Sequence, residues 1–195
     1  MDIWRQAGER YEFVSFYPHP DEAWVFEVTA LDRRGYLAIL IPDATPDADF
    51  TPMDESHAYV RWDDGTLPWT VVRRLADRGR HSMRPARPPV AVRGDVRSRA
   101  NTWRYGEREF VYRQFHFAAH RAWCHEIAEL HVPDNDFIDV KIPDRQRGPG
   151  PFVPATADRA NVYCHGEATL PWLVFLRFLA VVAASGHIVG TRVGG

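Results

Sequence analysis

Apolar and polar residues alternate along several short segments of the chain, which is the pattern of strands with one buried face. The clearest case is residues 24–31, where Trp24, Phe26 and Val28 share one face and Glu27 lies on the other. Clusters of proline, glycine and aspartate separate these segments, as turns do. The first half is therefore predicted to hold strands 11–17, 24–31, 36–41 and 57–62, then a helix ending near Gly79.

The second half of the chain shows the same order of segments. We expect strands at 109–117, 122–130, 137–142 and 160–165, followed by a helix at 170–185. Short sequences also return in the same order, among them Ile41-Pro42-Asp43 as Ile142-Pro143-Asp144 and Thr66-Leu67-Pro68-Trp69 as Thr169-Leu170-Pro171-Trp172. The matching positions lie about 100 residues apart, which indicates an internal duplication.

This pattern predicts an α+β fold that is internally duplicated. Each unit would be a ββββα unit with an antiparallel sheet, and the two units would form a pseudo-two-fold single-chain assembly. The predicted boundaries are 1–79 for the first repeat, 80–101 for a linker, and 102–195 for the second repeat with its C-terminal tail. The linker is inferred from composition, because it holds three prolines and six arginines.

The two predicted helices differ in polarity. Thr66 and Thr169 are each placed to cap a helix through the side-chain hydroxyl. The first helix carries charged residues on one face, whereas the second is apolar nearly all round. Helix 170–185 is therefore expected to be the more buried, covered by the other repeat, by the tail, or by a second copy of the chain in a homodimer.

Composition and charge narrow the function classes. A hydrophobic content of 45% supports a real core, and a net charge of −2 does not call for nucleic acid or membrane as a partner. The arginines of the linker are not interleaved with aromatic residues, which argues against a nucleic-acid arm. No segment is long and apolar enough for a membrane span or has the form of a signal peptide, so the expected location is cytoplasmic.

Two histidines in the second half replace large apolar residues of the first. His125 corresponds to Phe26, and His165 to Trp62, when the two repeats are compared position by position. Both are expected on the inward face of their strands. A partly buried histidine is suited to acid–base chemistry near neutral pH, although a histidine on a strand is also commonly a hydrogen-bonded core residue.

These residues define a candidate pocket in the second repeat. Its catalytic candidates are His125, His165 and Glu126, and its ligand-binding candidates are Trp123, Tyr163 and Arg177. Arg177 could instead pair with Glu126 as a structural ion pair. No metal or cofactor is expected, because strand alternation separates these histidines from Cys124 and Cys164, and no metal-binding spacing is present.

Two functional hypotheses follow. The leading one is a non-enzymatic binding protein that acts through a protein partner, in the manner of a small bacterial inhibitor or immunity-type protein. It is based on the acidic loop at 43–55, the basic linker and the absence of a catalytic motif. The alternative is a small-molecule enzyme or sensor with a histidine-lined pocket in the second repeat.

Overall fold

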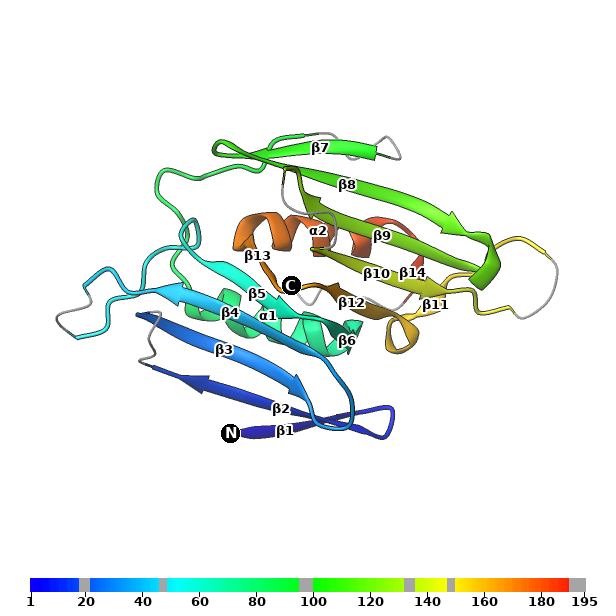
Figure 1. Cartoon of the computed structure of the whole chain (residues 1–195), viewed down its shortest axis with the longest axis horizontal. Coiled ribbons are helices and arrows are strands. Elements are labelled where there is room, and N and C mark those ends of the chain that lie inside the picture. The colour runs from blue at the N-terminus through cyan, green and yellow to red at the C-terminus, as the bar shows by residue number, and fades with distance from the viewer. Residues whose placement is uncertain (18–21, 46–48, 95–99, 132–135, 147–149, 190–195) are drawn as a thin grey trace.

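The computed structural model of the chain describes residues 1–17, 22–45, 49–94, 100–131, 136–146 and 150–189. These residues form two six-stranded sheets, two α-helices and a short parallel pair of strands (Figure 1). Every pairing within the two large sheets is antiparallel. The expected α+β class with antiparallel sheets is therefore confirmed.

The elements of the two halves follow one another in a similar order. The first half contains β1 (Asp2–Gln6), β2 (Glu9–Phe16), β3 (Ala23–Ala30), β4 (Tyr36–Pro42), β5 (Tyr59–Asp63), β6 (Gly65–Pro68) and α1 (Trp69–Ser82). The second half contains β7 (Ala100–Tyr105), β8 (Arg108–Phe117), β9 (Ala122–Glu129), β10 (Phe137–Pro143), β12 (Asn161–His165), β13 (Ala168–Pro171) and α2 (Trp172–Ala184). The parallel pair is β11 (Ala155–Thr156) with β14 (Ile188–Val189), and two 3-10 turns lie at Ala118–His120 and Ala157–Arg159.

The eight predicted strands are all present, as β2 to β5, β8 to β10 and β12. The count of four strands per half is nevertheless too low, because the structure adds β1 and β6 to the first half and β7, β11, β13 and β14 to the second. Two of these additions are short and end in proline, namely Gly65–Pro68 and Ala168–Pro171. A four-residue strand that includes glycine or proline has too weak a pattern to be separated from a turn.

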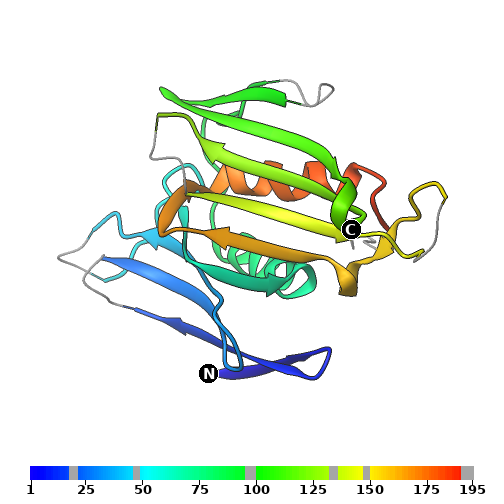
Figure 2. The same cartoon turned by 45° about the vertical axis from the view of Figure 1, so that its right-hand side comes forward.

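Each sheet is completed by a strand from the other half of the chain. The first sheet has the order β1-β2-β3-β4-β5-β13, and the second has the order β7-β8-β9-β10-β12-β6. Leu67 of β6 lies opposite Val162, and Leu170 of β13 lies opposite Val60. Figures 1 and 2 show this exchange at the centre of the molecule, where each helix follows directly from the exchanged strand.

The exchange explains how the helices begin, and it corrects the predicted caps. Thr66 and Thr169 lie inside β6 and β13, and proline stands at each N-cap position with no side-chain cap hydrogen bond. The first helical N–H groups donate across the exchange instead, from Trp69 to the Ala160 carbonyl and from Trp172 to the Ala58 carbonyl, both at 2.9 Å. Backbone acceptors from the other half of the chain, just before β12 and β5, thus replace the expected hydroxyls.

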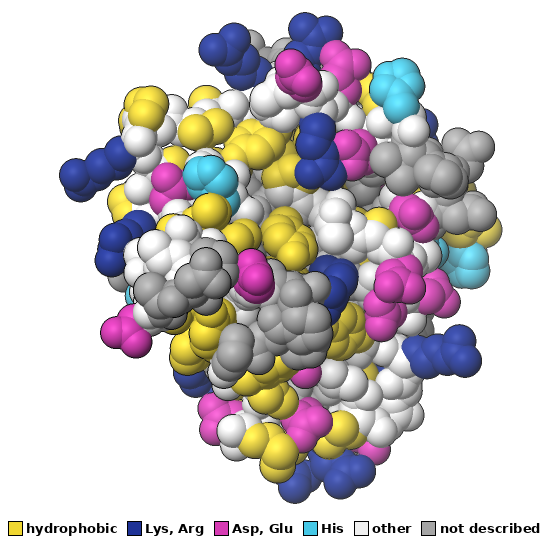
Figure 3. All heavy atoms as spheres, turned by 60° about the vertical axis from the view of Figure 1, so that its left-hand side comes forward, with side chains coloured by type: hydrophobic (Ala, Val, Ile, Leu, Met, Phe, Trp, Pro, Cys, Tyr) yellow, Lys and Arg dark blue, Asp and Glu magenta, His cyan; other side chains and the backbone are white. Residues whose placement is uncertain are grey.

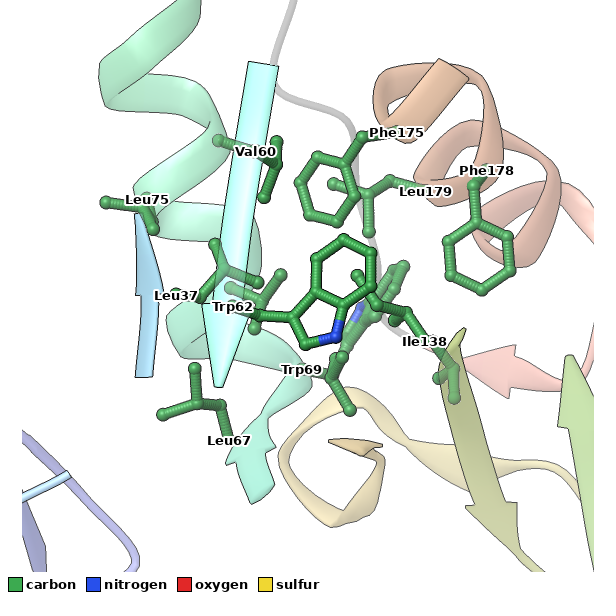
Figure 4. Packing of buried hydrophobic residues seen from close by; sticks show 14 of the residues in the cluster. Leu37, Val60, Trp62, Leu67, Trp69, Leu75, Ile138, Phe175, Phe178 and Leu179 are labelled. Carbon is green, nitrogen blue, oxygen red and sulfur yellow. The ribbon is translucent and has the colours of Figure 1, made fainter. Parts of the chain in front are cut away.

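Both helices lie on the same side of the molecule, behind the two sheets in the view of Figure 1. Their apolar faces and the inward faces of both sheets form one continuous core. Trp62 of β5 projects toward Phe175 and Leu179 of α2 in Figure 4, and it is 2% exposed. Its indole N–H donates to the His165 carbonyl at 3.1 Å, which ties the first sheet to the second.

Helix α2 is the more buried of the two, as predicted. Only Ala180 and Ala184 are exposed along it, whereas α1 exposes Arg74, Asp77, Arg78 and its last residues from Arg80. The sheets and α1 supply this cover within one chain. A homodimer through helix 170–185 is therefore not required for burial and stays a prediction.

We expect truncation of an exchanged strand to weaken both sheets. Leu67→Ala and Leu170→Ala each remove a side chain that is at most 2% exposed, so each should lower the free energy of unfolding by about 2–5 kcal/mol. Hydrogen exchange measured by mass spectrometry should show faster exchange in β3 and in β10 for either variant. Leu31→Ala, at an exposed position, is the control and should change stability by less than about 0.5 kcal/mol. Loss of protection confined to one sheet would contradict a shared core.

Candidate functional site

A hollow of about 520 Å³ opens on the outer face of the second sheet, the face turned away from the helices. Strands β9 and β10 form its floor, and side chains from β8 and β12 stand around it. Its polar lining includes Cys124, Glu126, Asp139, Lys141 and His165. A concave surface with apolar walls and a few converging polar groups is the usual form of a small-molecule site.

Strand alternation places these side chains on one face. On β10, Ile138 and Val140 point into the core, so Asp139 and Lys141 point outward. Antiparallel pairing then sets Asp139 beside Glu126. The outward residues of neighbouring strands are thus brought side by side by the register of the sheet.

The first sheet has apolar residues at the corresponding outward positions. By register, Val25, Ala38, Leu40 and Tyr59 of the first sheet correspond to Cys124, Asp139, Lys141 and Asn161 of the second. In the first sheet Val25, Ala38 and Leu40 are at most 2% exposed and form a small apolar cluster. At these positions the first sheet therefore carries an apolar cluster and the second a polar hollow, although Glu27 and Arg61 also lie on the outer face of the first sheet.

Asp139 is the central polar group of the hollow, and its residue is only 4% exposed. Its Oδ2 atom accepts from the Cys124 thiol at 3.5 Å, and lies 3.4 Å from Lys141 Nζ and 3.8 Å from His165 Nε2. Its Oδ1 atom is buried with no hydrogen-bond partner among the described residues. Burial raises the pKa of this carboxyl, and Lys141 and His165 oppose that shift.

The Cys124 thiol is a hydrogen-bond donor in this arrangement and not a nucleophile. Burial raises its pKa, and the negative charge of Asp139 raises it further. A thiol needs a lowered pKa to react as the thiolate near neutral pH. Any acid–base chemistry in the hollow therefore falls to Asp139 and its neighbours rather than to the cysteine.

The remaining lining is largely apolar and aromatic. Phe115 and Phe117 stand at the β8 side and are 38% and 44% exposed, above the small side chains of Ala122 and Cys124. On the β12 side, Lys141 lies over the Tyr163 ring, with Nζ 4.1 Å from its centroid. Two large aromatic rims above small floor residues account for the depth of the hollow.

The structure divides the six predicted site residues between the two faces of the second sheet. Glu126, Tyr163 and His165 line the hollow. His125, Trp123 and Arg177 lie on the helix side, so the predicted pocket containing both histidines does not form. The inward placement of Tyr163 and His165 was wrong, because Val162 and Cys164 are the core-facing residues of β12.

His125 is a fully buried core residue with both ring nitrogens bonded. Its Nδ1 atom lies 2.9 Å from the Tyr112 hydroxyl, and its Nε2 atom lies 3.0 Å from His187 Nδ1. The ring of His187 also stacks on Trp123, with centroids 4.1 Å apart. Burial lowers the pKa of His125 to about 3, and His187 adds to this effect, so the ring is neutral near neutral pH.

Arg177 does not pair with Glu126. Its guanidinium lies over the Trp103 ring at 4.6 Å from the centroid and donates to the backbone carbonyls of Val92 and Gly94. Glu126 pairs with Arg113 on the outer face, at 2.9 Å. The expected pairing was wrong because the two side chains lie on opposite faces of the sheet.

The acidic loop that suggested a protein partner is partly used within the chain. Asp43 accepts from the backbone N–H groups of Thr45 and Thr51, and Glu55 accepts from the backbone N–H of Ala86. Basic and acidic side chains are interspersed on the face shown in Figure 3 rather than gathered into one basic patch. Neither observation identifies a macromolecular partner.

The sequence reasoning missed Asp139, Lys141 and Cys124. The sequence of β10 has the pattern of an ordinary half-exposed strand, because Asp139 and Lys141 alternate with apolar residues. The signal was available in the other half, where Ala38 and Leu40 occupy the matching positions and indicate a buried outer face. A charged pair at such positions is the feature to look for.

Metal sites, membrane spans and relatives add no further assignment. Among the described residues, no group of three or more His, Cys, Asp or Glu side chains is arranged to hold a metal ion. None of the described helices is long and apolar enough to cross a bilayer. Comparisons with protein-family models, curated proteins and solved structures found no match to the chain.

The buried His125 should make the fold sensitive to acid. The unfolded chain binds a proton at this residue below about pH 6.5, while the folded chain resists it down to about pH 3. Folding stability should therefore fall as the pH drops through this window, by up to about 1.4 kcal/mol per pH unit from this group.

The double variant Tyr112→Phe/His125→Phe replaces the hydrogen-bonded Tyr112 and His125 with the residues that stand at the matching positions of the first sheet. It should remove this part of the pH dependence. Urea unfolding at several pH values between 4 and 7 measures it, with the exposed His81→Asn as the control. An unchanged slope in the double variant would show that His125 does not carry the effect.

Proposed function

We propose that the protein binds a small molecule in the hollow on the outer face of the second sheet. The observation that carries this proposal is the group of the buried Asp139 and Cys124 with the partly exposed Lys141, placed where the first sheet has Ala38, Val25 and Leu40. The proposal keeps the alternative of a small-molecule enzyme or sensor, and moves its pocket to the other face of the sheet.

Energetics support this reading. Taking a carboxylate out of water costs several kcal/mol, and the attraction to a nearby ammonium offsets this only in part. Lys141 is 39% exposed and lies 3.4 Å from Asp139, which is not a close bidentate pair. The matching first-sheet positions show that apolar residues fit this scaffold. Such a group is well explained by a binding role.

We also infer that the two halves arose by internal duplication, as the repeated sequences suggest. The matching strand registers and the reciprocal exchange of β6 and β13 support it. On this view the first outer face kept an apolar cluster, and the second diverged into a ligand site.

The hollow suits either a sensor or an enzyme. A carboxyl whose pKa burial raises, lying beside an imidazole, is a common acid–base arrangement. Tyr163 and Glu126 line the same hollow as candidates for substrate contact. The geometry supports ligand binding, and catalytic turnover would require that binding first.

A protein partner, as for an inhibitor or immunity-type protein, stays a prediction. Binding of a protein partner and binding of a ligand in the hollow do not exclude each other, because the rim residues Phe115 and Phe117 are exposed apolar side chains. The small-molecule proposal is preferred because Asp139, which has a buried and unpartnered Oδ1 atom, is one of the residues that line a concave site.

A library screen tests the proposal. Small molecules of 10 to 20 non-hydrogen atoms would be screened by thermal shift and by ligand-observed NMR against the wild type. The same screen would use Cys124→Val/Asp139→Ala/Lys141→Leu, which carries the residues of the first sheet. Glu27→Gln, on the outer face of the first sheet, is the matched control.

We expect ligands that bind the wild type and the control and lose binding to the triple variant. A library that yields no ligand, or ligands that bind the triple variant equally well, would contradict the proposal.

A further inference from the structure

The hollow has a polar end and an apolar end, and strand register sets their order. Asp139 and Glu126 lie side by side in one row across β10 and β9. Two rows further along the same face, Ala122 lies opposite Pro143 and Phe117. Cross-strand neighbours are about 5 Å apart, and residues two apart on a strand are about 7 Å apart. A ligand that fills the hollow therefore meets carboxylates at one end and an apolar wall at the other.

The polar end lacks a hydrogen-bond donor at one defined atom. Asp139 Oδ2 already receives the Cys124 thiol and faces Lys141 Nζ, whereas Oδ1 has no partner among the described residues. A buried acceptor without a donor costs about 1–3 kcal/mol. His165 Nε2 is likewise buried without a hydrogen-bond partner in the described structure, and it lies 3.8 Å from Oδ2. Two lining residues thus each hold a buried polar atom without a hydrogen-bond partner in the described structure.

Charge balance at this end favours a neutral ligand. Asp139 faces Lys141 at 3.4 Å, and Glu126 is paired with Arg113 at 2.9 Å. Each carboxylate therefore has its own cation. A cationic ligand would compete with these pairs, and an anionic one would face both carboxylates. A neutral N–H or O–H group is a donor from which the Asp139 carboxyl can accept without disturbing either pair.

The shape of the rest of the hollow favours a flat ring. Phe115 and Phe117 project beside the small Ala122 and Cys124 and are partly exposed, so a ring can pack against them. One face of Phe117 is already stacked on the His120 ring, with centroids 4.8 Å apart. Phe137 is already stacked on His165, with centroids 4.0 Å apart, so it fixes the imidazole at the polar end. Aromatic pairs of this kind add about 0.5–1.5 kcal/mol beyond the burial of area.

From this geometry we propose that the ligand is a neutral planar aromatic compound with a ring N–H or hydroxyl group, which donates to the Asp139 carboxyl while its ring packs against Phe115 and Phe117. This inference rests on the proposed function and specifies the chemical class that the hollow recognises. It assigns Asp139 as the residue that determines specificity, and it assigns the two phenylalanines as the apolar contact.

Matched pairs of probes test the donor. Indole, phenol and benzimidazole would each be titrated against the isotope-labelled protein, beside the N-methylated or O-methylated form of the same ring. Amide shifts of Ala122 and Cys124 report occupancy of the hollow. We expect at least one parent compound to bind about tenfold more tightly than its methylated form, because methylation removes the donor and leaves the acceptor unpaired. In Asp139→Ala this preference should disappear, while Glu27→Gln should keep it.

The outcomes separate this inference from the proposed function. If parent and methylated forms bind the wild type equally, the donor assignment is overturned while the hollow remains a binding site. If none of these rings binds but the wider library yields ligands that the triple variant loses, the ligand class is wrong and the proposed function stands. If Asp139→Ala keeps the preference, the donor is recognised elsewhere and the role of Asp139 is overturned.

Discussion

The reciprocal exchange of β6 and β13 is the constraint on which the rest of this structure depends. Each helix begins where an exchanged strand ends, and its first N–H group donates to a backbone carbonyl of the other half of the chain. Both helices are therefore fixed against both sheets, and the core is shared rather than divided. Trp62 lies at this junction, bonded to the backbone of His165 at 3.1 Å. One consequence is that both outer faces stay free of helices.

The two outer faces then show what the same scaffold can carry. In the first sheet, Ala38 and Leu40 belong to an apolar cluster that is closed to solvent. In the second, Asp139 and Lys141 stand at the matching positions beside a hollow of about 520 Å³. Stability alone favours apolar residues at buried positions, so a departure at equivalent sites within one molecule points to a binding role. The inner face of the second sheet also carries a polar residue, His125, but its ring is neutral and hydrogen-bonded at both nitrogens.

Much of the fold could be predicted from the sequence, because strand alternation and the repeated segments are strong signals. The exchange could not, since Gly65–Pro68 and Ala168–Pro171 are too short to show a period. The site was misplaced by a single residue. Alignment on the shared Thr-Leu-Pro-Trp sequence matched His165 to Trp62, whereas the sheet registers match Cys164 to Trp62. The turn before Thr169 is one residue longer than the turn before Thr66, and a slip of one residue turns every side chain of a strand to the other face.

The most direct test of this account is the stability of the chain without any ligand. The central claim is that the polar group of the hollow is kept for binding and weakens the fold. The free energy of unfolding in urea should therefore be higher for Cys124→Val/Asp139→Ala/Lys141→Leu than for the wild type, by about 1–4 kcal/mol. A triple variant less stable than the wild type by a similar amount would show that these residues form a structural network, and would contradict the account.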